Sequence, residues 1–71
     1  MYLTRTDKAA NLNRFYRIDI LQGLFGNWAL VREWGRIGSS GQVCTDWFEN
    51  EAEAKQARFY HHMKKAKRGY Q

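Results

Sequence analysis

The sequence predicts a small α+β domain, in which an antiparallel sheet of about four strands carries one C-terminal helix. Three observations predict this fold. The first two thirds of the chain contain short alternating segments separated by glycine-containing turns. The last third has the start and stop signals of a single helix. A chain of 71 residues is long enough for one domain only, so we expect residues 1–71 to fold as a unit.

Four segments have the composition or the alternation of β-strands. Residues 2–6 are rich in aromatic and β-branched types. Residues 14–21 alternate apolar and polar positions with a period of two, which is typical of a half-buried strand. Residues 28–36 and 42–48 each follow a turn that contains glycine. Short turns join neighbouring strands, so these segments are predicted to form an antiparallel meander.

Residues 51–67 are predicted to form the helix. Asn50 is a favourable N-cap residue, and Glu53 stands three positions later, where the second partner of a capping box belongs. Gly69 suits the left-handed position that ends many helices. Acidic residues in the first turn and basic residues in the last turn also match the helix dipole.

The two sides of this helix differ in character. Apolar residues share one side of a helical wheel: Ala52, Phe59, Met63 and Ala66, with Tyr60 at the edge. Basic residues share the opposite side: Arg58, His61, Lys65 and Arg68. We predict that the apolar side packs on the sheet through Phe59 and Met63, and that the basic side faces solvent.

The charge of the chain favours a polyanionic partner. Twelve Lys and Arg residues against seven Asp and Glu residues give a net charge of +5 and a pI of about 9.7. A pI above about 9 is typical of domains that bind nucleic acid, and the same charge opposes self-association, so we expect a monomer. No apolar segment approaches the roughly 20 residues of a membrane span, and residues 1–10 lack the apolar core of a signal peptide. We therefore expect a cytoplasmic protein with no membrane partner.

No catalytic or metal-binding motif is recognisable. Cys44 is the single cysteine, which excludes an internal disulfide and leaves an ordinary structural zinc site without its ligands. His61 and His62 are adjacent, so on a helix they point about 100° apart and cannot share a metal as an i, i+4 pair can. There is neither a glycine-rich phosphate loop before the helix nor a nucleophile elbow. We expect no enzymatic activity, cofactor or metal.

The end of the third predicted strand combines cations with an aromatic ring. Alternation places Arg32, Trp34 and Arg36 on one face, and Gly35 between them allows a partner's backbone to come close. An indole between two guanidinium groups can lie against a sugar or base while the cations hold phosphates. The same pattern fits a core tryptophan whose edges carry arginines as cation–π partners. Alternation does not distinguish the two interpretations, nor does it indicate which face of the sheet the helix covers.

The tripeptide Trp34-Gly35-Arg36, placed at the end of an alternating strand, resembles the signature of the WGR domain. Further matches extend the resemblance over residues 14–70: the segments 14–18 and 28–32, Ile37, the turn 38–41 with Gln42, Phe48, Ala54, and the ending Lys65…Gly69-Tyr70.

WGR domains occur within DNA-dependent poly(ADP-ribose) polymerases and as small free-standing or fused modules in bacteria. The family fold is an antiparallel sheet with one helix packed on it. In the polymerases the module engages DNA ends and breaks. Its signature tryptophan packs on the sugar near the terminus, and its signature arginine contributes to DNA or interdomain contacts. The resemblance implies these roles for Trp34 and Arg36 in a free-standing domain without ADP-ribosylation activity. It leaves open whether Arg36 faces DNA or a separate protein.

We therefore expect a module that binds nucleic acid, DNA rather than RNA, and DNA ends or breaks in particular. The expected contacts form two groups, one on the third strand and one at the end of the helix: Arg32, Trp34, Gly35 and Arg36, and then Lys64, Lys65, Lys67 and Arg68. The alternative is a protein-interaction module whose sheet face displays three tryptophans to a partner: Trp28, Trp34 and Trp47.

Overall fold

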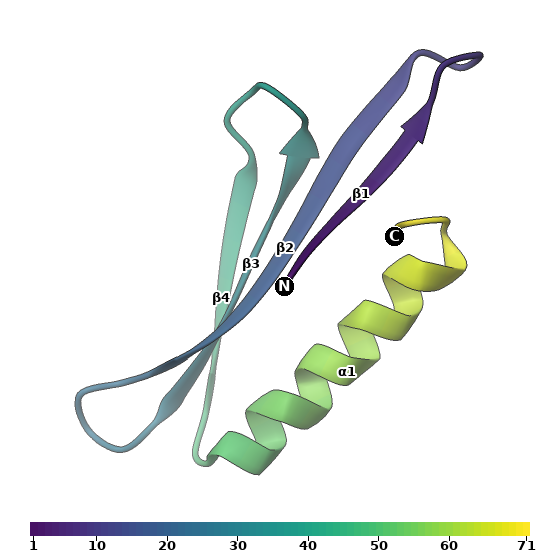
Figure 1. Cartoon of the computed structure of the whole chain (residues 1–71). Coiled ribbons are helices and arrows are strands. Elements are labelled where there is room, and N and C mark those ends of the chain that lie inside the picture. Colours follow the sequence, from purple (N-terminus) through teal and green to yellow (C-terminus); the bar gives the residue numbers. More distant parts are fainter.

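In the computed structural model, which describes all 71 residues, four strands form one antiparallel sheet and a single helix lies across one of its faces (Figure 1). The elements are β1 (Tyr2–Asp7), β2 (Leu12–Gln22), β3 (Trp28–Arg36), β4 (Gln42–Phe48) and α1 (Glu51–Lys67). The strand order is β1-β2-β3-β4, and each neighbouring pair is antiparallel. The predicted fold class is confirmed. The helix is neither long nor apolar enough to cross a membrane.

The register of the sheet is continuous from one end to the other. β2 pairs with β3 without interruption from Arg14 opposite Arg36 to Gln22 opposite Trp28. Both turns contain a glycine with positive φ, Gly26 (φ 81°) and Gly38 (φ 89°), a conformation that costs glycine little. Since side chains alternate along each strand, this register fixes which residues face the helix.

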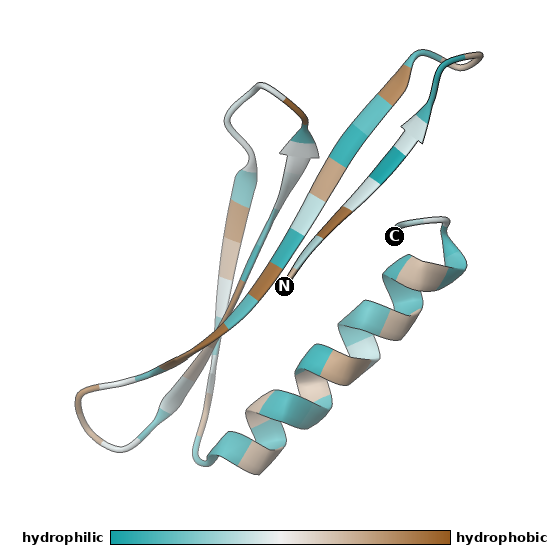
Figure 2. Ribbon diagram, in the orientation of Figure 1, coloured by the Kyte–Doolittle hydropathy of each residue, from teal (hydrophilic) through white to brown (hydrophobic).

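The core lies between the sheet and α1. Leu3, Tyr16, Ile18 and Leu30 form a buried cluster there, and Trp34 packs against it. Figure 2 shows apolar positions alternating with polar ones along β2, as expected for a strand with one buried face. The helix therefore covers the face that carries Trp34.

The helix packs with the side opposite to the one predicted. Its buried residue is Ala54, and Ala57 contacts the core cluster. Phe59 and Met63 are 63% and 39% exposed, so the prediction that they pack on the sheet is wrong. The physical reason is that the sheet supplies the large rings, among them Tyr16, so the helix approaches closely only where its own residues are small.

Both ends of the helix are capped as predicted. The side chain of Asn50 accepts a hydrogen bond from the backbone N–H of Glu53 at 2.9 Å. At the other end Gly69 has φ 93°, and its N–H donates to the carbonyl of Ala66 at 3.1 Å. The N–H of Tyr70 donates to the carbonyl of Lys65 at 3.2 Å, which completes a Schellman motif.

The chain that follows the helix returns to the sheet. The Tyr70 ring lies edge-on against Tyr16, with centroids 6.2 Å apart. Gln71 and Thr4 exchange two backbone hydrogen bonds of 2.8 Å each. These contacts hold the basic end of α1 beside β1 and β2, where the candidate site lies.

Candidate nucleic-acid interface

Trp34 is partly buried between the sheet and the helix. Its ring stacks on that of Tyr16, its partner across the β2–β3 register, with centroids 6.3 Å apart and planes at 29°. The Arg32 guanidinium lies 5.7 Å from the centre of the indole. Trp34 therefore combines the two interpretations of the sequence, because one part of it packs on the core and another lines a hollow.

Arg32 is held within the site by acceptors on β4. Its guanidinium donates to Cys44 Sγ and to the carboxylate of Asp46, each at 3.3 Å, and its side chain is only 19% exposed. Asp46 offsets much of its charge, and the indole covers one side of it. Arg32 thus positions Trp34 and has little free charge to offer a phosphate.

A hollow of about 240 Å³ opens between the sheet and the second half of α1. Its lining comes from three elements: Tyr16, Arg32, Trp34, His61, Lys64, Lys65 and Arg68. The structure therefore brings three predicted residues of the helix together with two of the strand. Three of the four side chains on the basic side of the helix, which the sequence placed in solvent, line this hollow instead: His61, Lys65 and Arg68.

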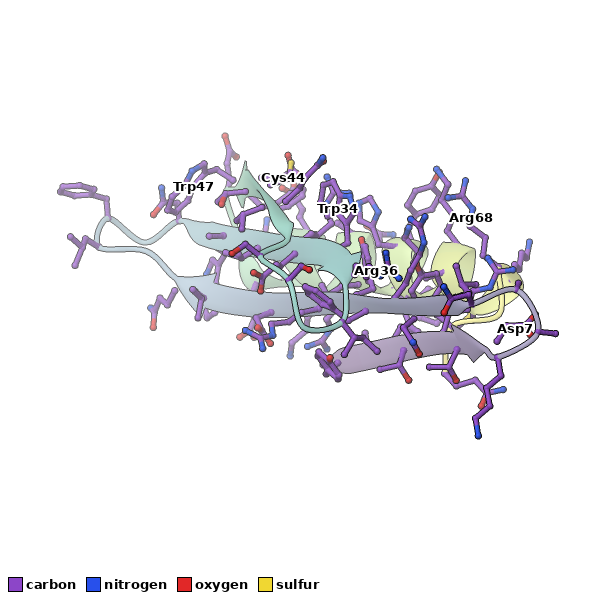
Figure 3. The ribbon with its side chains drawn as sticks, turned by 90° about the horizontal axis from the view of Figure 1, so that it is seen from above. Asp7, Trp34, Arg36, Cys44, Trp47 and Arg68 are labelled. Carbon is purple, nitrogen blue, oxygen red and sulfur yellow. The ribbon has the colours of Figure 1, made fainter.

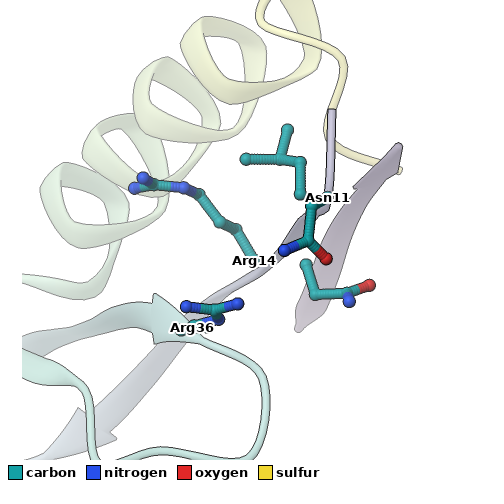
Figure 4. A pocket seen from close by; sticks show the side chains of 5 residues that line it. Asn11, Arg14 and Arg36 are labelled. Atoms are coloured by element: carbon teal, nitrogen blue, oxygen red, sulfur yellow. The ribbon is translucent and has the colours of Figure 1, made fainter. Parts of the chain in front are cut away.

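Arg36 lies in a second hollow of about 190 Å³, which Figure 4 shows from close by. The lining is polar and basic: Asn11, Leu12, Asn13, Arg14 and Arg36. Arg14 stands opposite Arg36 in the β2–β3 register, and its side chain extends toward α1 (Figure 4). Arg14 could not be assigned to the site from the sequence, because only the strand register reveals that the two arginines share a face.

The residues that line the two hollows and the exposed Trp47 lie toward opposite ends of the long axis of the molecule (Figure 3). In Figure 3, Trp34, Arg36 and Arg68 lie toward the end of the molecule that carries Asp7, and Trp47 lies toward the other end. We call the two neighbouring hollows the basic cleft. Neither hollow is lined by an acidic residue.

Burial and, to a smaller extent, repulsion among the cations of the cleft lower the pKa values of two groups. Burial lowers the pKa of Lys65, and the charges of Arg68 and Lys64 lower this pKa further. Burial also lowers the pKa of His61, and the charge of Arg32 adds to the effect. The Lys65 ammonium lies 4.7 Å from the ring centre of Tyr16, so its position is fixed by an aromatic contact. An anion in the cleft would relieve this repulsion.

Two of the predicted site residues lie elsewhere. A Cβ at Gly35 would stand 3.0 Å from Gly41 Cα and 3.5 Å from the Phe15 ring, on the face of the sheet away from the helix. The backbone that comes close to Gly35 is that of the same chain, so the predicted approach of a partner is wrong. Lys67 lines a separate hollow on the outer side of α1, with Phe59.

The three tryptophans do not share a sheet face. Trp28 pairs with Phe48 and has the parity of Trp34, so both lie on the face that the helix covers. Trp47 pairs with Ala29 on the opposite face and is 59% exposed. The alternative prediction of one face displaying all three tryptophans is therefore wrong.

Comparison with known proteins agrees with this architecture. A family model described as the WGR domain matches residues 1–71. The chain is also similar to an uncharacterised protein of Sinorhizobium fredii, with 39% identity over 70 residues that cover 99% of this chain and 34% of the relative. The chain thus spans about a third of the length of this curated relative. No solved structure matches it significantly. The chain belongs to the WGR domain family, a family of small nucleic-acid-binding modules found in poly(ADP-ribose) polymerases.

Proposed function

We propose that this domain binds DNA through the basic cleft. One observation carries the proposal: cations from β2, β3 and the C-terminal end of α1 line the two hollows of the cleft, with the Trp34 ring in one of them and no acidic residue in either. Five of the cations that line the cleft lack an acidic partner within the chain: Arg14, Arg36, Lys64, Lys65 and Arg68. Such a surface suits a chain of phosphates better than a single anion or an acidic side chain.

The cations and the Trp34 indole would contact different parts of the DNA. Arg14, Arg36, Lys64 and Arg68 would hold phosphates, which positions the domain on any DNA. The Trp34 ring would lie against a sugar or base. Because this ring is partly covered by Tyr16 and Arg32, it can reach a sugar at a strand end more easily than one enclosed within an intact duplex. The domain should therefore prefer DNA with an accessible end.

Competition between linear and circular DNA tests this preference. Wild-type protein bound to a fluorescent blunt-ended hairpin is challenged with equal masses of linear and closed circular duplex. Trp34→Ala should weaken binding to ends by about 5- to 150-fold, as expected for the loss of one stacked base at about 1–3 kcal/mol, and should remove the preference for linear DNA. Trp47→Ala is the matched control, because this tryptophan is 59% exposed on the uncovered face of the sheet.

One outcome would count against the proposal. If wild type and folded Trp34→Ala bind circles as well as ends with equal affinity, Trp34 serves the core alone. Since Trp34 also packs on the core cluster, each variant is first compared with wild type by thermal denaturation. Trp34→Leu retains apolar bulk without a flat ring, so it separates loss of stacking from loss of packing.

A protein partner is the second candidate. The observation that favours it is the face of the sheet that no helix covers, where Val43 and Trp47 are 61% and 59% exposed. Exposed tryptophan is a frequent centre of protein interfaces. A contact through this face should survive neutralisation of Lys64 and Arg68 and should change little with salt.

A further inference from the structure

The two ends of the molecule carry opposite charge. Residues 18–31 and 42–54 contain five of the seven acidic residues and not a single Lys or Arg. Strand pairing places these segments side by side, because Trp28 pairs with both Gln22 and Phe48. This acidic end holds the β2–β3 turn and the start of α1 (Figure 1), whereas the helix residues that line the basic cleft belong to the second half of α1 and its C-terminal cap. The acidic residues concerned are Asp19, Asp46, Glu49, Glu51 and Glu53. Three of them pair with cations of the chain, Asp19 with the N-terminus, Asp46 with Arg32 and Glu51 with Lys55, so Glu49 and Glu53 remain unpaired.

An apolar knob projects from the acidic end. It consists of Leu24 and Phe25, which are 96% and 92% exposed at the tip of the β2–β3 turn. The turn is closed by the N–H of Gly23, which donates to the carbonyl of Asn27 at 2.8 Å, and by the positive φ of Gly26. A three-residue turn of this kind needs glycine at its third position but no apolar residue at the first two. Leu24 and Phe25 therefore do nothing for the fold, and a departure from local rules without a structural gain indicates a function.

An apolar hollow lies on the side of α1 that faces away from the sheet. Its volume is about 440 Å³, and we call it the outer hollow. Its floor is apolar and its rim carries two lysines: Gln56, Phe59, Tyr60, Met63, Lys64 and Lys67. This is the stripe that the helix leaves unburied. A surface of large apolar side chains beside cations suits a partner that offers an apolar group among carboxylates.

We propose that the knob of one copy of this domain docks into the outer hollow of a second copy. The knob is apolar and lies at the end of the molecule that holds the unpaired Glu49 and Glu53, and the hollow is apolar and rimmed by Lys64 and Lys67, so the two surfaces are complementary in polarity and in charge. Nucleic acid does not fit the knob, because two apolar side chains cannot pair with phosphates and residues 18–31 contain no Lys or Arg.

The geometry of this contact determines the kind of assembly. Knob and hollow are different surfaces, so the contact is heterologous, and each copy can contact one neighbour through its knob and another through its hollow. The contact area of two side chains is far below the roughly 1,200 Å² of a stable complex, so assembly is weak and concentration-dependent. The expectation of a monomer at micromolar concentration therefore stands, and short chains of copies form only in concentrated solution. The proposal does not depend on DNA binding.

Two variants that each disable one half of the contact provide the test, without nucleic acid present. Phe25→Ser removes the knob, and Met63→Glu disables the hollow. Sedimentation from about 20 µM to about 1 mM should show the average mass of the wild type rising with concentration, as for a weak interface. Each variant alone should remain monomeric. Their equimolar mixture should form a heterodimer and nothing larger, because one functional knob and one functional hollow remain.

The matched control is a substitution of an exposed apolar residue outside both surfaces. Leu21→Ser removes an apolar side chain that is 56% exposed outside both surfaces, and should associate like the wild type. If Met63→Glu fails to fold, Lys67→Glu on the exposed rim serves instead. The proposal is overturned if the wild type stays monomeric at about 1 mM, a concentration at which weak contacts are populated. It is also overturned if either variant associates normally, or if the mixture forms no heterodimer although the wild type associates.

Discussion

Replacing Phe59 by alanine should leave the domain almost as stable as the wild type, although Phe59 belongs to the most apolar side of α1. Fully burying a phenylalanine side chain contributes about 1.5–3 kcal/mol. Because 63% of Phe59 is exposed, only about a third of this value is lost, or roughly 0.5–1 kcal/mol. In a domain of this size, 1 kcal/mol corresponds to about 4–8 °C in Tm.

Leu30→Ala is the matched comparison. Leu30 is 0% exposed and belongs to the core cluster. Its truncation should cost about 2–5 kcal/mol, from lost transfer energy and the cavity left behind. A domain of 71 residues has a total stability of about 4–11 kcal/mol at roughly 0.05–0.15 kcal/mol per residue, so this variant should be close to unfolding.

Urea and thermal denaturation, followed by circular dichroism and tryptophan fluorescence, measure both variants. A Phe59→Ala protein that loses as much stability as Leu30→Ala would place the apolar side of the helix against the sheet. It would contradict both the helix orientation and the existence of the outer hollow.

Two further predictions concern a glycine and a histidine. Gly41→Ala should cost about 1–3 kcal/mol by overpacking, and more than Gly35→Ala, because its Cβ would stand 2.5 Å from the carbonyl oxygen of Trp34; denaturation curves that rank the two in reverse would contradict this. His61 has a pKa lowered by burial and by nearby cations, so its contribution to stability is present above pH about 6.5 and is lost as the pH falls below that value. Bound phosphates should raise this pKa, so DNA affinity should increase as the pH falls from about 8 to about 6; His61→Gln should flatten both profiles, and anisotropy titrations that show no flattening would refute the assignment.

Local signals explain why most of the fold could be predicted. The period of two in β2 and the cap residues Asn50 and Gly69 act within a few residues of where they stand, so the sequence alone reveals them. The helix orientation could not be predicted in the same way. It depends on the rings that the sheet presents, of which Tyr16 is the most deeply buried, and a helical wheel contains no information about that surface.

The candidate site was predictable only where its residues lie on one element. Alternation predicts that Arg32, Trp34 and Arg36 share a strand face, and the uninterrupted β2–β3 register confirms that they do. Arg14 enters the cleft through strand register, which no local pattern reveals. Gly35 was predicted to let a partner's backbone come close. The backbone that lies there is that of Gly41, which follows the next turn and could not be placed beside Gly35 from the sequence.

The salt dependence of DNA binding tests the basic cleft most directly. Affinity for a blunt-ended hairpin, measured by fluorescence anisotropy, should fall about a hundredfold between about 50 and 200 mM salt if about four phosphates are held. Arg68→Gln should weaken binding and reduce the salt slope by about one unit. Lys67→Gln, which removes the adjacent charge on the outer side of the helix, should leave the slope nearly unchanged. A flat salt dependence of the wild type, or equal effects of the two substitutions, would contradict the account.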